Sequence, residues 1–157
     1  MRKLFVIPFI ILMLLCGCSK SLEPAPPKTE FSATVVCENE TYSITHNGKT
    51  ITTITCIEPQ ELKGLTYSYQ GNEVSINYNS LSYKPSDELP DNKITDLHRI
   101  IQELSSDCEY LIKSCDSQKT VFELPTALVE CVTTSGIIQK ITLKTNGTVY
   151  IFSNSEN

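Results

Sequence analysis

The stretch that decides the fold is residues 65–78, which read Leu-Thr-Tyr-Ser-Tyr-Gln-Gly-Asn-Glu-Val-Ser-Ile-Asn-Tyr. Large apolar side chains alternate with small polar ones on both sides of the central Gly71-Asn72 pair. Strict alternation is typical of a strand with one buried face, and Gly-Asn favours the positive φ angles of a tight turn. We therefore expect an antiparallel hairpin here, with one dry and one wet face.

The same pattern continues in both directions along the chain. Further turn signals occur at Asn47-Gly48, Ser135-Gly136 and Asn146-Gly147, and the runs between turns are rich in Val, Ile, Thr and Tyr. The predicted strands cover residues 31–38, 41–46, 49–57, 65–70, 73–78, 81–84, 109–114, 119–124, 127–133, 137–143 and 147–153. This spacing predicts a β meander of about eleven strands.

The period changes once, after Leu89-Pro90. Asp91 or Asn92 can cap a helix, and the apolar residues that follow it recur with the 3.6-residue helical period: Ile94, Leu97, Ile100, Ile101 and Leu104. Residues 31–157 are thus predicted to form one mainly β domain. We expect a curved antiparallel half-barrel with one amphipathic helix packed on its concave face.

The amino terminus has the features of an export signal. Arg2 and Lys3 precede a run of 12 apolar residues from Leu4 to Leu15, which is typical of a signal peptide and too short to span a membrane. Leu15-Cys16-Gly17-Cys18 resembles the bacterial lipobox. Residues 1–17 are therefore predicted to be a lipoprotein signal peptide, with an ordinary secretory leader cleaved nearby as the alternative.

In the lipoprotein interpretation, Cys18 becomes the lipidated first residue of the mature chain. It would carry a diacylglyceryl group, with or without an added N-acyl chain, and two acyl chains anchor a protein stably. Residues 18–30 include Pro24, Pro26 and Pro27 and are predicted to be an extended tether. The expected location is the extracytoplasmic face of the cell membrane, or the outer membrane in a diderm cell.

Composition narrows the choice of partners. Arg2 and Lys3 leave with the leader, so the mature chain carries 11 basic and 18 acidic residues, a formal charge of −7. This balance argues against nucleic acid and against a polybasic grip on anionic lipids. The predicted partners are the membrane through the anchor, and a lipid ligand or an envelope protein.

Several spaced motifs resemble a known group of proteins. They are Phe31-Ser32-Ala33, Glu58-Pro59-Gln60-Glu61-Leu62-Lys63-Gly64-Leu65-Thr66-Tyr67, Val74–Tyr78, Leu81-Ser82-Tyr83, Leu89-Pro90 and Val149–Asn154. Together with the leader, they resemble small Firmicutes-type lipoproteins related to the LolA/LppX lipoprotein-carrier fold. The resemblance implies an open half-barrel that shelters acyl chains beneath its helix, although this chain has one predicted helix where the larger carriers have several. The fold also resembles that of a germination lipoprotein that partners a cell-wall amidase.

Two functions follow from these expectations. The first is a non-enzymatic binding module for lipid or lipoprotein, in which an acyl chain contacts the concave face and the helix: Tyr67, Tyr69, Ile76, Tyr78, Tyr83, Leu97, Ile101 and Leu104. The competing interpretation is that Leu97, Ile101 and Leu104 already fill this hollow. The second function is an adaptor that presents a sheet edge or tyrosine face to a cell-wall or sporulation/germination enzyme.

No catalytic or metal-binding constellation is evident. His46 and His98 do not share a metal-ligand spacing, and we expect both at the surface or in caps. No Gly-x-Ser-x-Gly or complete Ser-x-x-Lys set occurs, so we predict no enzyme, no metal and no cofactor beyond the lipid on Cys18. A hydrolase built from scattered acids such as Glu58, Glu61, Asp87 and Glu88 is the third alternative.

Five cysteines follow Cys18, so at least one is unpaired: Cys37, Cys56, Cys108, Cys115 and Cys131. A meander places Cys37 two strands from Cys56, and Cys115 two strands from Cys131. These separations exceed the Cα spacing of about 5.5 Å that a disulfide needs. We expect free thiols that pack as small core residues.

Overall fold

The computed structural model describes residues 23–71, 73–85, 91–106 and 109–154, so the predicted leader and Cys18 lie outside the described part. Its strands are β1 (Glu30–Cys37), β2 (Glu40–Asn47), β3 (Ile51–Glu58), β4 (Thr66–Gln70), β5 (Glu73–Tyr78), β6 (Leu81–Tyr83), β7 (Leu111–Cys115), β8 (Lys119–Glu123), β9 (Ala127–Val132), β10 (Ile138–Leu143) and β11 (Val149–Asn154). The described helices are the short 3-10 helix η1 (Gln60–Leu62) and the α-helix α2 (Lys93–Ser105). All eleven predicted strands are present, and the single amphipathic helix is confirmed.

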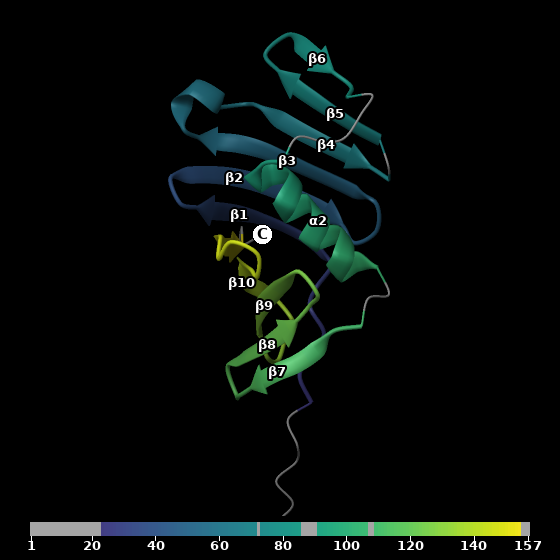
Figure 1. Ribbon diagram of the computed structural model, residues 1–157, viewed down its shortest axis with the longest axis vertical. Helices are drawn as coiled ribbons and strands as arrows, with labels where there is room; N and C mark the ends of the chain where they lie inside the picture. Colours follow the sequence, from purple (N-terminus) through teal and green to yellow (C-terminus); the bar gives the residue numbers. More distant parts are fainter. Residues whose placement is uncertain (1–22, 72, 86–90, 107–108, 155–157) are drawn as a thin grey trace, which may run out of the picture.

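The strands form one open antiparallel sheet in the order β6-β5-β4-β3-β2-β1-β11-β10-β9-β8-β7. It consists of two meanders, β1–β6 and β7–β11, joined where β1 pairs with β11 through partners such as Val35 and Phe152. The sheet is curved and its edges, β6 and β7, lie at opposite ends of the molecule (Figure 1). The predicted half-barrel is therefore confirmed.

Helix α2 crosses one face of the sheet (Figure 1). Its amino terminus is fixed by Asn92, whose side chain accepts a 2.9 Å hydrogen bond from the Thr95 amide, and by the Tyr150 hydroxyl, which donates to the Lys93 carbonyl at 2.9 Å. The predicted apolar stripe is buried against the concave side: Ile94, Leu97, Ile100, Ile101 and Leu104. Packing of this stripe, rather than intrinsic helix propensity, stabilises a helix of this length.

One row of side chains shows how far the helix covers the sheet. Directly paired residues point to the same face, and one such row runs across six strands: Ala33, Ile44, Ile54, Tyr67, Ile76 and Tyr83. Burial is nearly complete as far as Tyr67, but Tyr83 is 61% exposed. Tyr83 therefore lies on the concave face, as expected, but beyond the reach of the helix.

The last residues of the predicted tether are docked on the domain. The Ala25 amide donates to the Thr133 carbonyl at 2.8 Å, and the Lys28 amide to the Gly136 carbonyl at 2.8 Å. Gly136 has a φ of +66°, and a Cβ there would lie 1.9 Å from the Pro26 carbonyl oxygen, so glycine permits this close approach. Within the predicted tether of residues 18–30, the segment from Ala25 onward is thus part of the folded domain.

The expectation that both histidines lie at the surface or in caps is wrong, because both are buried. His46 continues the inward alternation of Tyr42 and Ile44 on β2 and is 1% exposed, and His98 lies one helical turn after Ile94 on the buried stripe. His46 lies beside a predicted turn, so its place in the inward alternation of β2 was not recognised. His98 is polar, so it was not counted with the apolar stripe of the helix.

The hydrogen bonds of His46 fit a neutral ring. Ser105 Oγ donates to the Ile101 carbonyl, so it can accept from His46 Nε2 at 2.8 Å, and Nδ1 then accepts from Thr52 Oγ1 at 2.8 Å. Burial lowers the pKa of His46, which agrees with this assignment.

The cysteines lie as the meander predicts. Strand β2 separates Cys37 from Cys56, and strand β8 separates Cys115 from Cys131. These four thiols are free, and all except Cys115 are buried. Cys108 lies outside the described residues.

Candidate functional site

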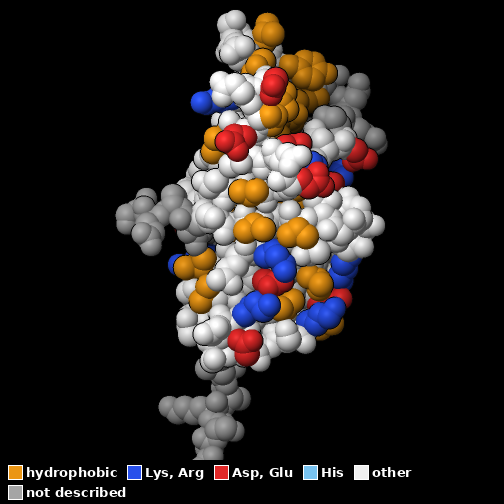
Figure 2. All heavy atoms as spheres, turned by 90° about the vertical axis from the view of Figure 1, so that its left-hand side faces the viewer, with side chains coloured by type: hydrophobic (Ala, Val, Ile, Leu, Met, Phe, Trp, Pro, Cys, Tyr) orange, Lys and Arg blue, Asp and Glu red, His pale blue; other side chains and the backbone are white. Residues whose placement is uncertain are grey.

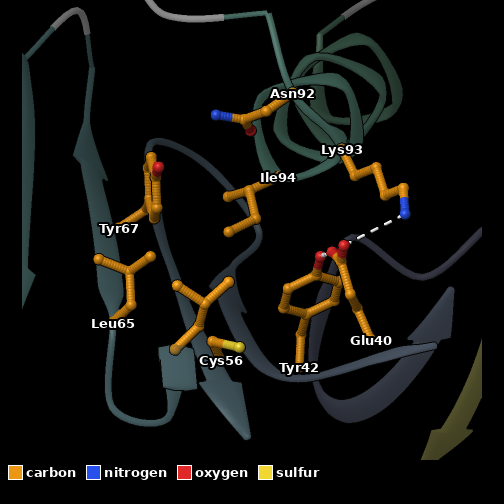
Figure 3. Close-up of a pocket in the computed structure, with 9 residues that line it drawn as sticks. Glu40, Tyr42, Cys56, Leu65, Tyr67, Asn92, Lys93 and Ile94 are labelled. Carbon is orange, nitrogen blue, oxygen red and sulfur yellow. Dashed lines mark hydrogen bonds and ion pairs between the residues drawn. The ribbon is translucent and has the colours of Figure 1, made fainter. Parts of the chain in front are cut away.

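An apolar groove of about 340 Å³ opens beside the first turn of α2 (Figure 3). It is lined by β2, β3, η1, β4, the loop before β4 and the start of the helix: Glu40, Tyr42, Cys56, Leu62, Leu65, Tyr67, Asn92, Lys93 and Ile94. We call this space the groove. Its volume lies within the roughly 300–1,000 Å³ typical of small-molecule sites.

The apolar walls of the groove come from β2, β3, β4, η1, the loop before β4 and one apolar residue of α2. Tyr42 and Cys56 are direct partners on β2 and β3, and Tyr67 lies on the inward face of β4. Figure 3 shows Ile94 reaching from the helix toward the space between Tyr67 and Tyr42, with Leu65 and Cys56 beneath it. The groove is therefore enclosed mainly by hydrocarbon and aromatic surface.

The polar side of the groove is an ion-pair cluster. Lys93 Nζ lies 3.2 Å from Glu40 Oε1 and 2.7 Å from Glu38 Oε2, and the Tyr42 hydroxyl donates to Glu40. The hydrogen bond to Glu38, supported by Glu40, raises the pKa of Lys93. Because two carboxylates face one ammonium, the cluster carries a net charge of about −1 and does not favour an anionic headgroup.

The groove contains no activated nucleophile among its described residues. The Cys56 thiol donates to the Glu58 carbonyl at 3.1 Å, and burial raises its pKa. A thiol must ionise to attack a substrate, so Cys56 is suited to packing and not to catalysis. In the described ranges, no group of three or more His, Cys, Asp or Glu side chains could hold a metal ion.

The centre of the concave face, in contrast, is filled. Leu97 and Ile101 are completely buried, and the His98 ring stacks on Tyr69 with centroids 3.5 Å apart. Burial lowers the pKa of His98 to about 4 and raises the pKa of Tyr69 to about 12, so both rings are neutral at physiological pH. The hollow under most of α2 is thus a core.

The eight residues proposed from the sequence to contact lipid are dispersed. Tyr67 lines the groove. Tyr69, Leu97, Ile101 and Leu104 belong to the core, and Ile76 packs against it. Tyr78 donates to the Glu61 carbonyl at 2.7 Å, and Tyr83 is exposed. The proposed lipidation residue, Cys18, lies outside the described residues.

Sequence reasoning missed most of the groove, although one signal was present. Leu62 and Leu65 belong to the Pro-x-x-Leu-x-Gly-Leu-x-Tyr segment that ends at Tyr67, and all three line one wall. Apolar residues that continue through a turn into a strand can indicate such a wall. Glu40 and Lys93 carry no comparable signal, because they are 53 residues apart.

An apolar strip continues from the groove to the edge of the sheet. Tyr67 pairs with Ile76, and Ile76 pairs with Tyr83 on β6. Leu81, also on β6, is 72% exposed. Figure 2 shows hydrophobic side chains gathered at this end of the molecule.

No protein-family model matches this chain, and no curated protein matches its sequence. One solved structure that matches is a LolA superfamily protein, NE2245 from Nitrosomonas europaea, with 11% identity and a TM-score of 0.38 over 80% of this chain and 81% of that chain.

No helix within the described residues is long and apolar enough to cross a bilayer.

Proposed function

We propose that this chain is a lipid-anchored extracytoplasmic lipoprotein whose groove binds the hydrocarbon part of a lipid or of a lipoprotein, without catalysis. The observation that carries the proposal is the open apolar groove beside the first turn of α2. An acyl chain is the ligand that best matches walls of Leu, Ile and Tyr, because its transfer from water is favourable in proportion to the apolar area buried.

The strip beyond the groove supports a long ligand. Ile76 and Tyr83 continue the apolar surface of Tyr67 toward the edge strand β6. A chain lying in the groove can therefore extend along the strip, while its headgroup stays in water. The acidic cluster of Glu38, Glu40 and Lys93 favours a neutral or zwitterionic headgroup over an anionic one.

The anchoring part of the proposal depends on the leader. The leader has the three features of a lipoprotein signal peptide in the expected order: a positive start, an apolar run of signal-peptide length and the sequence Leu15-Cys16-Gly17-Cys18. Replacing Cys18 with Ala should give a protein that is uncleaved or not lipidated. Recovery of this variant with a lipid-modified mass in the detergent phase would contradict the assignment.

Ligand binding is tested by titrating the protein with a phosphatidylethanolamine that carries a fluorescent acyl chain. Leu62 lines the groove and is 43% exposed, so Leu62→Glu should place a charge in the groove without disturbing the core. We expect affinity to fall about tenfold or more, or about 1.4 kcal/mol. The matched control is Ile151→Glu, at a half-exposed apolar position on the other face of the sheet.

Native mass spectrometry of protein purified gently from membranes provides the second measurement. A lipid-sized adduct that is lost in Leu62→Glu and kept in Ile151→Glu supports a lipid-binding groove. Equal probe binding by the two variants, or a mass without adduct in every sample, would overturn it.

The open edge of β6 favours one alternative function, that of a protein adaptor. Its two large apolar side chains are exposed, Leu81 at 72% and Tyr83 at 61%, and an unpaired strand edge can accept a strand from a partner. Co-purification of one envelope protein with the wild type, and its loss in Leu81→Lys, would favour the adaptor. If the partner is lost in Leu62→Glu instead, the partner binds the groove and not the β6 edge.

A further inference from the structure

The edge strand at the other end of the sheet, β7, exposes one large apolar side chain on each face. Leu111 is 71% exposed and Ile112 is 53% exposed. Leu111 pairs with Glu123, whereas Ile112 pairs with the buried Phe122, so the two side chains point to opposite faces of the sheet. Together they form an apolar ridge at the end of the molecule, which we call the β7 ridge.

The described chain begins beside this ridge. Pro26 and Leu111 line the same surface hollow, between the docked amino-terminal segment and β7. Ala25 is hydrogen-bonded to Thr133. The Thr133 amide in turn donates at 3.0 Å to the Gln118 carbonyl, which lies in the turn between β7 and β8. In Figure 1 the amino-terminal segment also runs toward the end of the molecule where β7 lies.

The distance to the proposed anchor is therefore short. Cys18 precedes Ala25 by seven residues, which span at most about 25 Å. The β6 edge lies ten strand spacings away from β7, or about 48 Å along the sheet. An anchor at Cys18 thus holds the β7 end of the domain near the bilayer and leaves the β6 end distant from it.

We propose that the β7 ridge rests in the membrane interface beside the lipid anchor, so that the domain stands on this edge with the β6 end pointing away. The inference rests on the proposed lipidation of Cys18. Leu111 and Ile112 would enter the boundary between headgroups and acyl chains. The exposed Lys113, which follows them, can extend its ammonium group to the lipid phosphates.

The sequence offers a clean spectroscopic test, because it contains no tryptophan. In Leu111→Trp the new residue is the sole tryptophan, and Ile51→Trp is the control, at an exposed apolar position on the outer face of β3, seven strand spacings from β7 and away from the groove and the strip. Each variant is expressed with its leader, purified from membranes and reconstituted into phosphatidylcholine vesicles with or without bromine on the acyl chains. We expect bromine to reduce Leu111→Trp fluorescence by about half or more, and to leave Ile51→Trp nearly unchanged, because interfacial side chains lie about 5–10 Å deep.

Flotation of the same vesicles separates failure of the ridge from failure of the anchor. If the protein floats with the vesicles but Leu111→Trp is not quenched, the protein is anchored but its β7 edge is not in the membrane interface. If both variants are quenched equally, the domain has no fixed orientation on the membrane. Either result overturns the inference and leaves the anchor intact. Protein that does not float overturns the anchor and the inference together. Ile112→Trp repeats the test if Leu111→Trp does not show the wild-type circular dichroism.

Discussion

The concave face of the sheet has two regions with similar apolar side chains. One region is filled by the helix and forms core, and the other stays open as the groove. Under the middle of α2, Leu97 and Ile101 meet the sheet and form a core, whereas beside the first turn only Ile94 reaches over the strands, and the groove remains open. A helix of 13 residues is about 20 Å long, and a sheet of eleven strands is about 48 Å wide. The comparison shows that helix length, more than residue type, decides which apolar surface becomes core and which becomes a site.

The largest test of this contrast compares truncations in the two regions. Ile101→Ala removes a completely buried side chain and should lower the free energy of unfolding by about 2–5 kcal/mol. Leu62→Ala, at the groove, should cost less than about 1 kcal/mol. Urea denaturation measures both changes. Equal losses would mean that the groove wall contributes as much to the core as the helix does.

The second test uses the pH dependence of the filled region. Burial lowers the pKa of His98 from 6.5 to about 4, so below pH 6.5 the unfolded chain binds a proton that the folded chain excludes. The free energy of unfolding should therefore fall as pH falls through this window, by about 2 kcal/mol between pH 7 and pH 5 from this group. His98→Phe keeps a ring against Tyr69 without titrating, and its stability should depend less on pH. Thermal melts of the wild type and of His98→Phe across this pH range measure the effect. If stability falls equally with pH in the two proteins, His98 is excluded as the cause.

A third test concerns the boundary between the regions. Asn92 caps α2 through the Thr95 amide and also lines the groove. Asn92→Ala should cost about 1 kcal/mol of stability and loosen the first turn. Asn92→Asp keeps an acceptor at the cap and should restore most of the loss. If Asn92→Ala weakens probe binding more than Asn92→Asp does, then the first turn shapes the groove.

The smallest expected effect uses cysteines as reporters of the two regions. Cys56 lines the groove, whereas burial in the core raises the pKa of Cys37 to about 11 and the pKa of Cys131 to about 12. We expect an apolar maleimide to modify exposed Cys115 first, Cys56 slowly, and the two core thiols least. A bound acyl chain should slow the reaction of Cys56 alone, as located by peptide mass spectrometry. Protection of Cys131 instead would place the ligand elsewhere.

Most of the fold could be predicted because its signals are local. Alternation in residues 65–78, glycine turns and the stripe from Ile94 to Leu104 identify the strands and the helix within a few residues of their ends. The site is less predictable because it depends on contacts between distant elements. Lys93 meets Glu38 and Glu40 only after the helix crosses the sheet, and the different burial of Tyr67 and Tyr83 follows from where that helix stops.

The pairing of β1 with β11 determines when the sheet can be completed during synthesis of the chain. Val35 and Phe152 are neighbours in the sheet although almost the whole domain lies between them in the chain. A polypeptide leaves a ribosome or a translocon amino terminus first, so β1 waits with one edge unpaired until the last strand has emerged. Closing so long a loop is slow relative to forming hairpins, and an intermediate with an open central edge is prone to aggregation. Because β11 is the one strand that pairs with both β1 and β10, its deletion would divide the sheet into two separate parts.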